Sequence, residues 1–174
     1  DKFLQKNITL LSGIEIRNQE KLYNSALMLN KDSISSIYNK MRLLPNVEYT
    51  PNFFNFFRLN PGLYNFAFGS KLSHFNLKGI DFSAMVCLES IFPWPTRETV
   101  KNGAQFIVYI VNDGWYTRFP EPQQHARRSI FRAIENRRTV VRCANTGISM
   151  IVNPYGNILS TGNFCFLKTT TLPL

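Results

Sequence analysis

The sequence is poor in features that would assign a function at once. Its 3 cysteines include no Cys-x-x-Cys spacing, so we expect no disulfide framework and no zinc site, while a single functional thiol remains open. The longest apolar run covers residues 106–111, far below the roughly 18–20 residues that span a bilayer. The chain begins at Asp1, without a starting Met or a signal peptide, and we expect a partial chain.

Acidic residues are also scarce relative to basic ones. Lys and Arg total 20 against 11 Asp and Glu, a formal charge of +9. A basic balance favours anionic partners such as phospholipid head groups, although it fits plain solubility equally well. We expect no nucleic-acid partner, because no zinc-finger spacing or aromatic RNA-binding motif accompanies the densest basic group, which is Arg127, Arg128, Arg132, Arg137 and Arg138.

What is present is an ordinary globular composition, with 44% apolar and 18% charged residues, and a pattern of alternating elements. The pattern predicts an α/β domain with a mixed sheet. An apolar stripe of Ala126, Ile130, Ala133 and Ile134 supports the longer helix. Expected helices cover 93–103 and 122–138, and expected strands cover 9–16, 22–29, 34–38, 80–87, 105–111, 139–144, 148–152 and 157–160.

Cys87 is the first candidate for chemistry. It ends an expected buried strand on a turn into a helix, where a thiol is exposed and backbone N–H groups can hold an oxyanion. By position alone a buried structural Cys is the commoner reading. Lys40, Glu48 and Glu89 would each, taken singly, be solvated surface charges, but a cation beside a thiol lowers its pKa and a buried Glu can hold that cation.

A series of short motifs favours the functional interpretation of these residues. Read in order, it resembles the apolipoprotein N-acyltransferases of the carbon–nitrogen hydrolase (nitrilase) superfamily from about Leu11 to Gly156. The resemblance implies a nitrilase-like αββα sandwich with mixed β-sheets, incomplete at the N-terminus, with residues 1–174 as a partial catalytic domain. The motifs are YNSALML, YNKMRLLPNVEYTP, VCLESIF, VNDGWY, QQH, FRAIENRRTVVRCANTGIS and NPYG.

The active site of that family is a Glu–Lys–Cys triad. The resemblance assigns its Lys to Lys40 and its nucleophile to Cys87, matches two further functional carboxylates to Glu48 and Glu89, and gives an oxyanion donor at the Leu88 N–H. The third member of the triad, the general-base Glu, lies well upstream of YNSALML in the family. No residue before Leu11 matches it, and Glu15 and Glu20 are wrongly placed relative to that motif. We therefore expect that the base precedes this piece, which would be inactive alone.

The sequence also departs from the family pattern. Asn46-Val47 replaces Phe-Gly before Glu48, so that loop must bend differently, and Leu88 replaces a Tyr. His125, in the QQH motif, is interpreted as a structural or capping group.

The resemblance implies acyl transfer in two steps without a cofactor or metal. Cys87 takes a fatty acyl chain from a membrane phospholipid as a thioester, and the amine of a diacylglyceryl-cysteine on an apolipoprotein receives it. The expected location is the bacterial inner membrane, facing the periplasm, with membrane attachment through segments outside this sequence. Phe53 to Phe57 would be an interfacial lid or a plain core cluster. A soluble nitrilase-type amidohydrolase and a non-catalytic basic binding domain are the alternatives.

Overall fold

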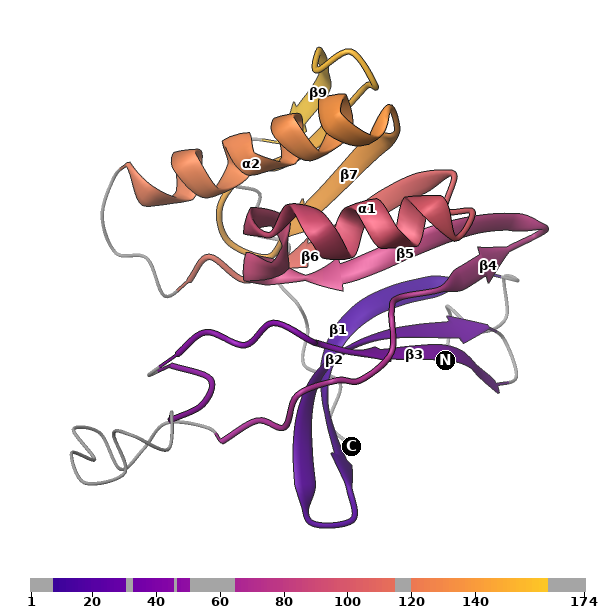
Figure 1. Ribbon diagram of the computed structural model, residues 1–174, viewed down its shortest axis with the longest axis vertical. Helices are drawn as coiled ribbons and strands as arrows, with labels where there is room; N and C mark the ends of the chain where they lie inside the picture. The colour runs from indigo at the N-terminus through magenta and orange to yellow at the C-terminus, as the bar shows by residue number, and fades with distance from the viewer. Residues whose placement is uncertain (1–7, 31–32, 46, 51–64, 115–119, 163–174) are drawn as a thin grey trace.

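The computed structural model describes residues 8–30, 33–45, 47–50, 65–114 and 120–162. They form two β-sheets and a layer of helices (Figure 1). The smaller sheet is antiparallel and contains β1 (Leu10–Asn18), β2 (Lys21–Asn30) and β3 (Ser33–Asn39). The larger sheet has six strands in chain order: β4 (Phe75–Leu77), β5 (Ile80–Val86), β6 (Phe106–Val111), β7 (Thr139–Ala144), β8 (Ser149–Val152) and β9 (Ile158–Gly162).

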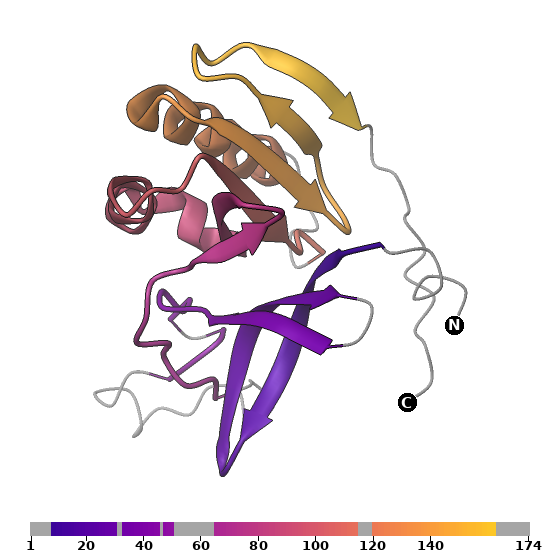
Figure 2. The same cartoon turned by 90° about the vertical axis from the view of Figure 1, so that its right-hand side faces the viewer.

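The parallel centre of the larger sheet determines where the helices lie. Strands β5, β6 and β7 are parallel neighbours, joined by crossovers that contain η3 (Cys87–Ile91) with α1 (Pro93–Lys101), and then α2 (Glu121–Asn136). Because such crossovers are right-handed and the strands follow one direction across the sheet, both helices fall on the same face. The other face packs against the smaller sheet, as Figures 1 and 2 show.

One hydrophobic core lies between these layers. Ala26, Met28 and Tyr38 of the smaller sheet share it with buried side chains of β5, β6 and β7. The α/β class and the mixed sheet predicted from the sequence are thereby confirmed, and the described residues provide both sheets and one helix layer of the predicted αββα sandwich. Within the described ranges, no helix combines the length and apolar character that crossing a bilayer requires.

Most predicted elements exist, with ends shifted by one or two residues. The short strand β4 was missed because its signal lies in the turn: Lys78 and Gly79 have φ of 52° and 85°, which close a tight hairpin onto β5. The predicted apolar stripe is wrong at Ile134, which is 39% exposed. Residues 53–57, expected as an interfacial lid or a core cluster, lie outside the described residues.

Residues 65–69 run back beside the smaller sheet and support the segment that follows β3. The Ala67 N–H donates to the Leu22 carbonyl at 2.7 Å, and the Gly69 N–H donates to the Lys40 carbonyl at 2.8 Å. Gly69 is required for this approach, because a Cβ there would overlap the backbone carbonyl of Asn39. The Lys40 N–H in turn donates to the Asn24 carbonyl of β2 at 2.8 Å, so both backbone polar groups of Lys40 are hydrogen-bonded.

We predict that Gly69→Ala destabilises the protein by about 2 kcal/mol, because the backbone of Asn39 and Lys40 has to move away from the new methyl group. Gly162→Ala is the matched control, since a Cβ there meets the Ser149 Cβ at 3.5 Å, an ordinary contact. Urea unfolding compares the two. Equal midpoints for both variants would contradict the prediction.

Candidate active site

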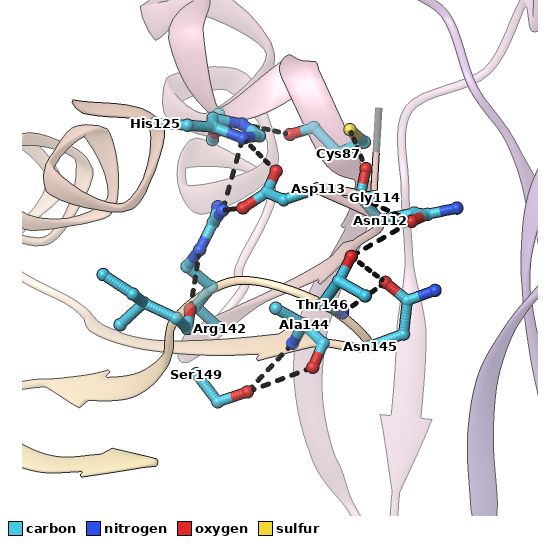
Figure 3. A network of polar contacts seen from close by, with 12 residues as sticks. Cys87, Asn112, Asp113, Gly114, His125, Arg142, Ala144, Asn145, Thr146 and Ser149 are labelled. Carbon is cyan, nitrogen blue, oxygen red and sulfur yellow. Dashed lines mark hydrogen bonds and ion pairs between the residues drawn. The ribbon is translucent and has the colours of Figure 1, made fainter. Parts of the chain in front are cut away.

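The carboxyl ends of the parallel strands bring the site together. Cys87 follows β5, Asn112 and Asp113 follow β6, and Asn145 follows β7. Because parallel neighbours end at one edge of a sheet, these residues meet there (Figure 3). The Asn145 N–H donates to the Val111 carbonyl at 3.1 Å, which joins the last two strand ends directly.

Cys87 begins a turn and does not end a strand. Strand β5 stops at Val86, and Cys87 takes a φ of 51°, in the left-handed region that non-glycine residues rarely adopt. Its thiol lies within hydrogen-bonding distance of the Asn112 carbonyl, at 3.8 Å. Burial raises the pKa of the Cys87 thiol, and the nearby Lys40 ammonium opposes that shift. The thiol is therefore mostly protonated at neutral pH and needs a base to react.

Lys40 lies directly after β3 with only 1% of its surface exposed. Its ammonium donates to both carboxylate oxygens of Glu48 at 2.7 Å. Glu48 is itself held by the Leu44 N–H and the Asn24 side-chain amide, both at 2.8 Å. A paired ammonium with so many fixed neighbours has little freedom, so the Lys40 charge that lowers the pKa of the Cys87 thiol has a fixed position.

Glu89 is fully buried and connects the two halves of the site. Its carboxyl group accepts hydrogen bonds from the N–H groups of Met41 and Arg42, at 2.8 and 3.1 Å, and from the Tyr38 hydroxyl at 2.7 Å. Its other oxygen accepts from the Val86 N–H at 2.9 Å. Burial raises the pKa of Glu89, and the bonds from Val86 and Tyr38 work against that rise.

The predicted site residues thus come together from distant parts of the chain. Lys40 and Glu48 pair directly, and the Lys40 charge is felt at Cys87. Glu89 does not pair with Lys40 and instead accepts hydrogen bonds from the Met41 and Arg42 N–H groups that follow Lys40. Leu88 is the second residue of η3, where helical N–H groups have no partner within the helix. Asn46 lies outside the described residues.

The sequence reasoning missed a second buried group beside Cys87, made of Asp113, His125 and Arg142. A His125 nitrogen, an Asp113 oxygen and the Cys87 sulfur all lie within 4.8 Å of one another. The capping alternative for His125 is wrong, because α2 begins at Glu121, and His125 is 4% exposed with its ring against Asp113 at 2.7 Å. The sequence did contain a signal for this group: Asp113 directly follows one expected strand, and Arg142 is a charged residue within the next expected strand.

Cys, Asp and His together are also the donor types of a metal site. Here, however, one Asp113 oxygen accepts from Arg142 at 2.7 Å, and the other contacts His125. The remaining ring nitrogen of His125 lies 3.0 Å from the Ser90 hydroxyl. A cation bound next to the Arg142 guanidinium would be repelled, so the arrangement suits a hydrogen-bonded network better than a metal ion.

Known proteins resemble this chain over most of its length. The carbon–nitrogen hydrolase family matches residues 4–164. The apolipoprotein N-acyltransferase of Thermotoga maritima is 34% identical over 159 residues, covering 90% of this chain and 31% of that protein. The one from Aquifex aeolicus is 32% identical over 162 residues, covering 91% and 36%. The chain therefore spans about a third of the length of these relatives.

Solved structures agree on the fold. A nitrilase-superfamily protein of Saccharomyces cerevisiae superimposes with a TM-score of 0.72 at 19% identity, over 93% of this chain and 58% of that one. A carbon–nitrogen hydrolase of Helicobacter pylori gives 0.69 at 20% identity, over 92% and 60%. At these identities the likeness concerns the fold alone. Together with the sequence match, it shows that this chain belongs to the carbon–nitrogen hydrolase family and has the nitrilase fold.

Proposed function

We propose that this chain is the catalytic part of an N-acyltransferase that moves a fatty acyl chain from a phospholipid to the amine of a lipoprotein cysteine. The observation that carries the proposal is a thiol on a left-handed turn beside a buried, carboxylate-held lysine. The relatives named apolipoprotein N-acyltransferase support this choice of substrates. The reaction is assigned to the complete gene product.

In the first step the Cys87 sulfur attacks the ester carbonyl of the phospholipid. The thiol proton passes to a carboxylate base and then to the departing alkoxide, so a lysophospholipid leaves and a thioester remains on Cys87. Lys40 and the Leu88 N–H stabilise the negative charge on the tetrahedral oxygen. Desolvation around the lysine strengthens its attraction for that charge.

The base is the first Glu of the family's triad. Glu48 is unsuited to that role because Lys40, Leu44 and Asn24 already donate to it. Glu89 is unsuited for the same reason, since its carboxyl group accepts from Tyr38 and three backbone N–H groups. We expect the 174 residues alone to be inactive for lack of this base.

In the second step the neutral amine of a diacylglyceryl-cysteine attacks the thioester carbonyl. The C–N bond forms, the C–S bond breaks, and the amine proton returns to the Cys87 thiolate through the base. The thiolate is a good leaving group, so the amine can attack the thioester and form an amide. Attack by water at the same carbonyl would release a free fatty acid instead. The competing amidohydrolase function differs only in using water at this step.

Exposed apolar side chains near the nucleophile support a lipid donor, and we assign the reaction to the periplasmic face of a bacterial inner membrane from the named relatives. Ile91 and Phe92 end the turn that Cys87 begins, and each is 36% exposed. The Arg42 guanidinium lies 4.9 Å from the Trp94 ring centroid and 5.9 Å from that of Phe92. Apolar and aromatic groups next to a fixed cation match an acyl chain joined to a phosphate.

We predict that Cys87 carries an acyl group when the complete gene product is incubated with phospholipid and no amine acceptor. Intact-mass analysis should show one added acyl chain, released by hydroxylamine as thioesters are. Cys87→Ala should abolish it, whereas Cys143→Ser, which removes an exposed thiol on β7, should not. Acylation that survives Cys87→Ala would refute the proposal. Release of the acyl group as a free fatty acid, even with the lipoprotein amine present, would favour the hydrolase.

We predict that Lys40→Met lowers the acyl-transfer rate by roughly 10²–10³-fold, because a charge that stabilises the oxyanion is lost. The same change should raise the pH at which iodoacetamide alkylates Cys87 at half its maximal rate, since Lys40 lowers the pKa of that thiol.

Two further variants control for folding. Lys40→Met with Glu48→Gln removes the unpaired buried carboxylate, and Lys101→Met removes an exposed lysine paired with Glu98. An unchanged alkylation profile in both Lys40 variants would count against the assignment.

We predict that Phe92→Ser raises the KM for phospholipid in mixed micelles roughly tenfold, the equivalent of losing one partly buried apolar side chain. Because Phe92 does not touch the reacting atoms in this scheme, kcat should change little. Phe131→Ser, on the outer side of α2 and 52% exposed, is the matched control. A KM that rises equally in both variants would remove the lipid-contact role.

A further inference from the structure

A chain of buried polar groups lies directly behind the nucleophile turn. Asp113 accepts from the Arg142 guanidinium through one oxygen and contacts His125 Nδ1 through the other, both at 2.7 Å. His125 Nε2 then lies 3.0 Å from the Ser90 hydroxyl and 3.3 Å from the Cys87 carbonyl. All these polar side chains are at most 4% exposed, and Figure 3 shows the ring between the Cys87 backbone and Asp113.

The chemistry of the partners orients the ring. An ionised carboxylate only accepts hydrogen bonds, so Nδ1 of His125 carries the proton that it shares with Asp113. Nε2 is thereby left as an acceptor directed at η3: the Ser90 hydroxyl donates to it at 3.0 Å, and the Cys87 carbonyl lies 3.3 Å from it. The Cys87 thiol has a different hydrogen-bond partner, the Asn112 carbonyl at 3.8 Å. His125 is thus placed to hold the turn, and not to take the thiol proton.

The turn needs such support because its first residue is strained. A left-handed φ costs a residue other than glycine about 1–2 kcal/mol, and it persists only where the surroundings enforce it. Glu89 fixes the residue before Cys87 by accepting from the Val86 N–H at 2.9 Å. His125 contacts the turn after it, at Ser90 and at the Cys87 carbonyl. Cys87 therefore lies between two fixed points.

We propose that His125 is a positioning residue for Cys87, held in place by Asp113 and Arg142 so that its Nε2 keeps the nucleophile turn in its left-handed shape. This proposal rests on the proposed function, since the turn matters only if Cys87 reacts. Arg142 comes from β7 and also donates to the Ile148 carbonyl at 3.1 Å. Its guanidinium anchors the Asp113–His125 pair to β7, the neighbour of the strand that Asp113 follows.

Two amide substitutions of His125 distinguish the role of Nδ1, which contacts Asp113, from that of Nε2, which contacts Ser90. The amide of His125→Asn can replace Nδ1 and still donate to Asp113, but it is too short to reach Ser90. The longer amide of His125→Gln reaches the position of Nε2. Both variants leave an uncharged polar group of similar burial, so their folding costs are comparable.

The test measures kcat and KM for acyl transfer, together with the rate of Cys87 alkylation, in the complete gene product. His125→Asn should lower kcat on the order of 30-fold with little change in KM, because a displaced nucleophile loses its attack geometry. His125→Gln should recover most of that loss. Ser90→Ala should slow both reactions on the order of 5-fold, since it removes the hydroxyl that joins the turn to Nε2.

Tyr109→Phe is the matched control. It removes a buried hydrogen bond of 2.7 Å to Thr96, which involves neither Cys87 nor His125, so it should change the melting temperature but neither rate by more than about 2-fold. If His125→Asn and His125→Gln lose activity equally, and only in proportion to their melting temperatures, the positioning role is overturned.

The outcomes also separate this proposal from the proposed function. If unmodified protein transfers no acyl group, the proposed function fails, while the alkylation rates of the variants still test the positioning role. If acyl transfer is normal and Ser90→Ala and both His125 variants match unmodified protein in both rates, the positioning role alone fails. A His125→Asn variant that does not fold leaves His125→Gln and Ser90→Ala to decide.

Discussion

The arrangement of the site depends on the carboxyl group of Glu89. It is fully buried, and every partner described above donates to it: the Tyr38 hydroxyl and the N–H groups of Met41, Arg42 and Val86. Tyr38 lies on the smaller sheet, Met41 and Arg42 follow it, and Val86 ends a strand of the larger sheet, so one side chain joins the backbone after Lys40 to the backbone before Cys87. A buried carboxyl group that lost these donors would be costly, and the same cost keeps the two segments in register.

Around that connection, each part of the site is held by its own set of contacts. Glu48 holds the Lys40 ammonium through both oxygens, and the return segment at Gly69 holds the Lys40 carbonyl. The Asn112 carbonyl accepts the hydrogen bond of the Cys87 thiol, and His125 lies behind the turn. The groups proposed to react therefore need little reorganisation, which is how a protein stabilises a developing charge cheaply.

Particular residues show how far the sequence could lead. Strands such as 105–111 were predictable because an unbroken apolar run signals burial on both faces, and the motif resemblance singled out Lys40, Glu48, Cys87 and Glu89. Strand β4 was not predictable, because its three residues depend on a tight turn at Lys78 and Gly79. His125 was interpreted too loosely, because its partners lie 12 and 17 residues away, on a strand end and inside a strand.

By itself, the sequence determined the class of the fold, the family and the residue types available for chemistry, because these follow from local periodicity and from ordered motifs. Only the tertiary structure decided that Glu89 contacts the backbone beside Lys40, that Cys87 adopts a left-handed φ, and that Asp113, His125 and Arg142 form one network. Those features depend on which strand ends meet at one edge of a sheet. Such meetings join residues far apart in the chain, and no local pattern records them.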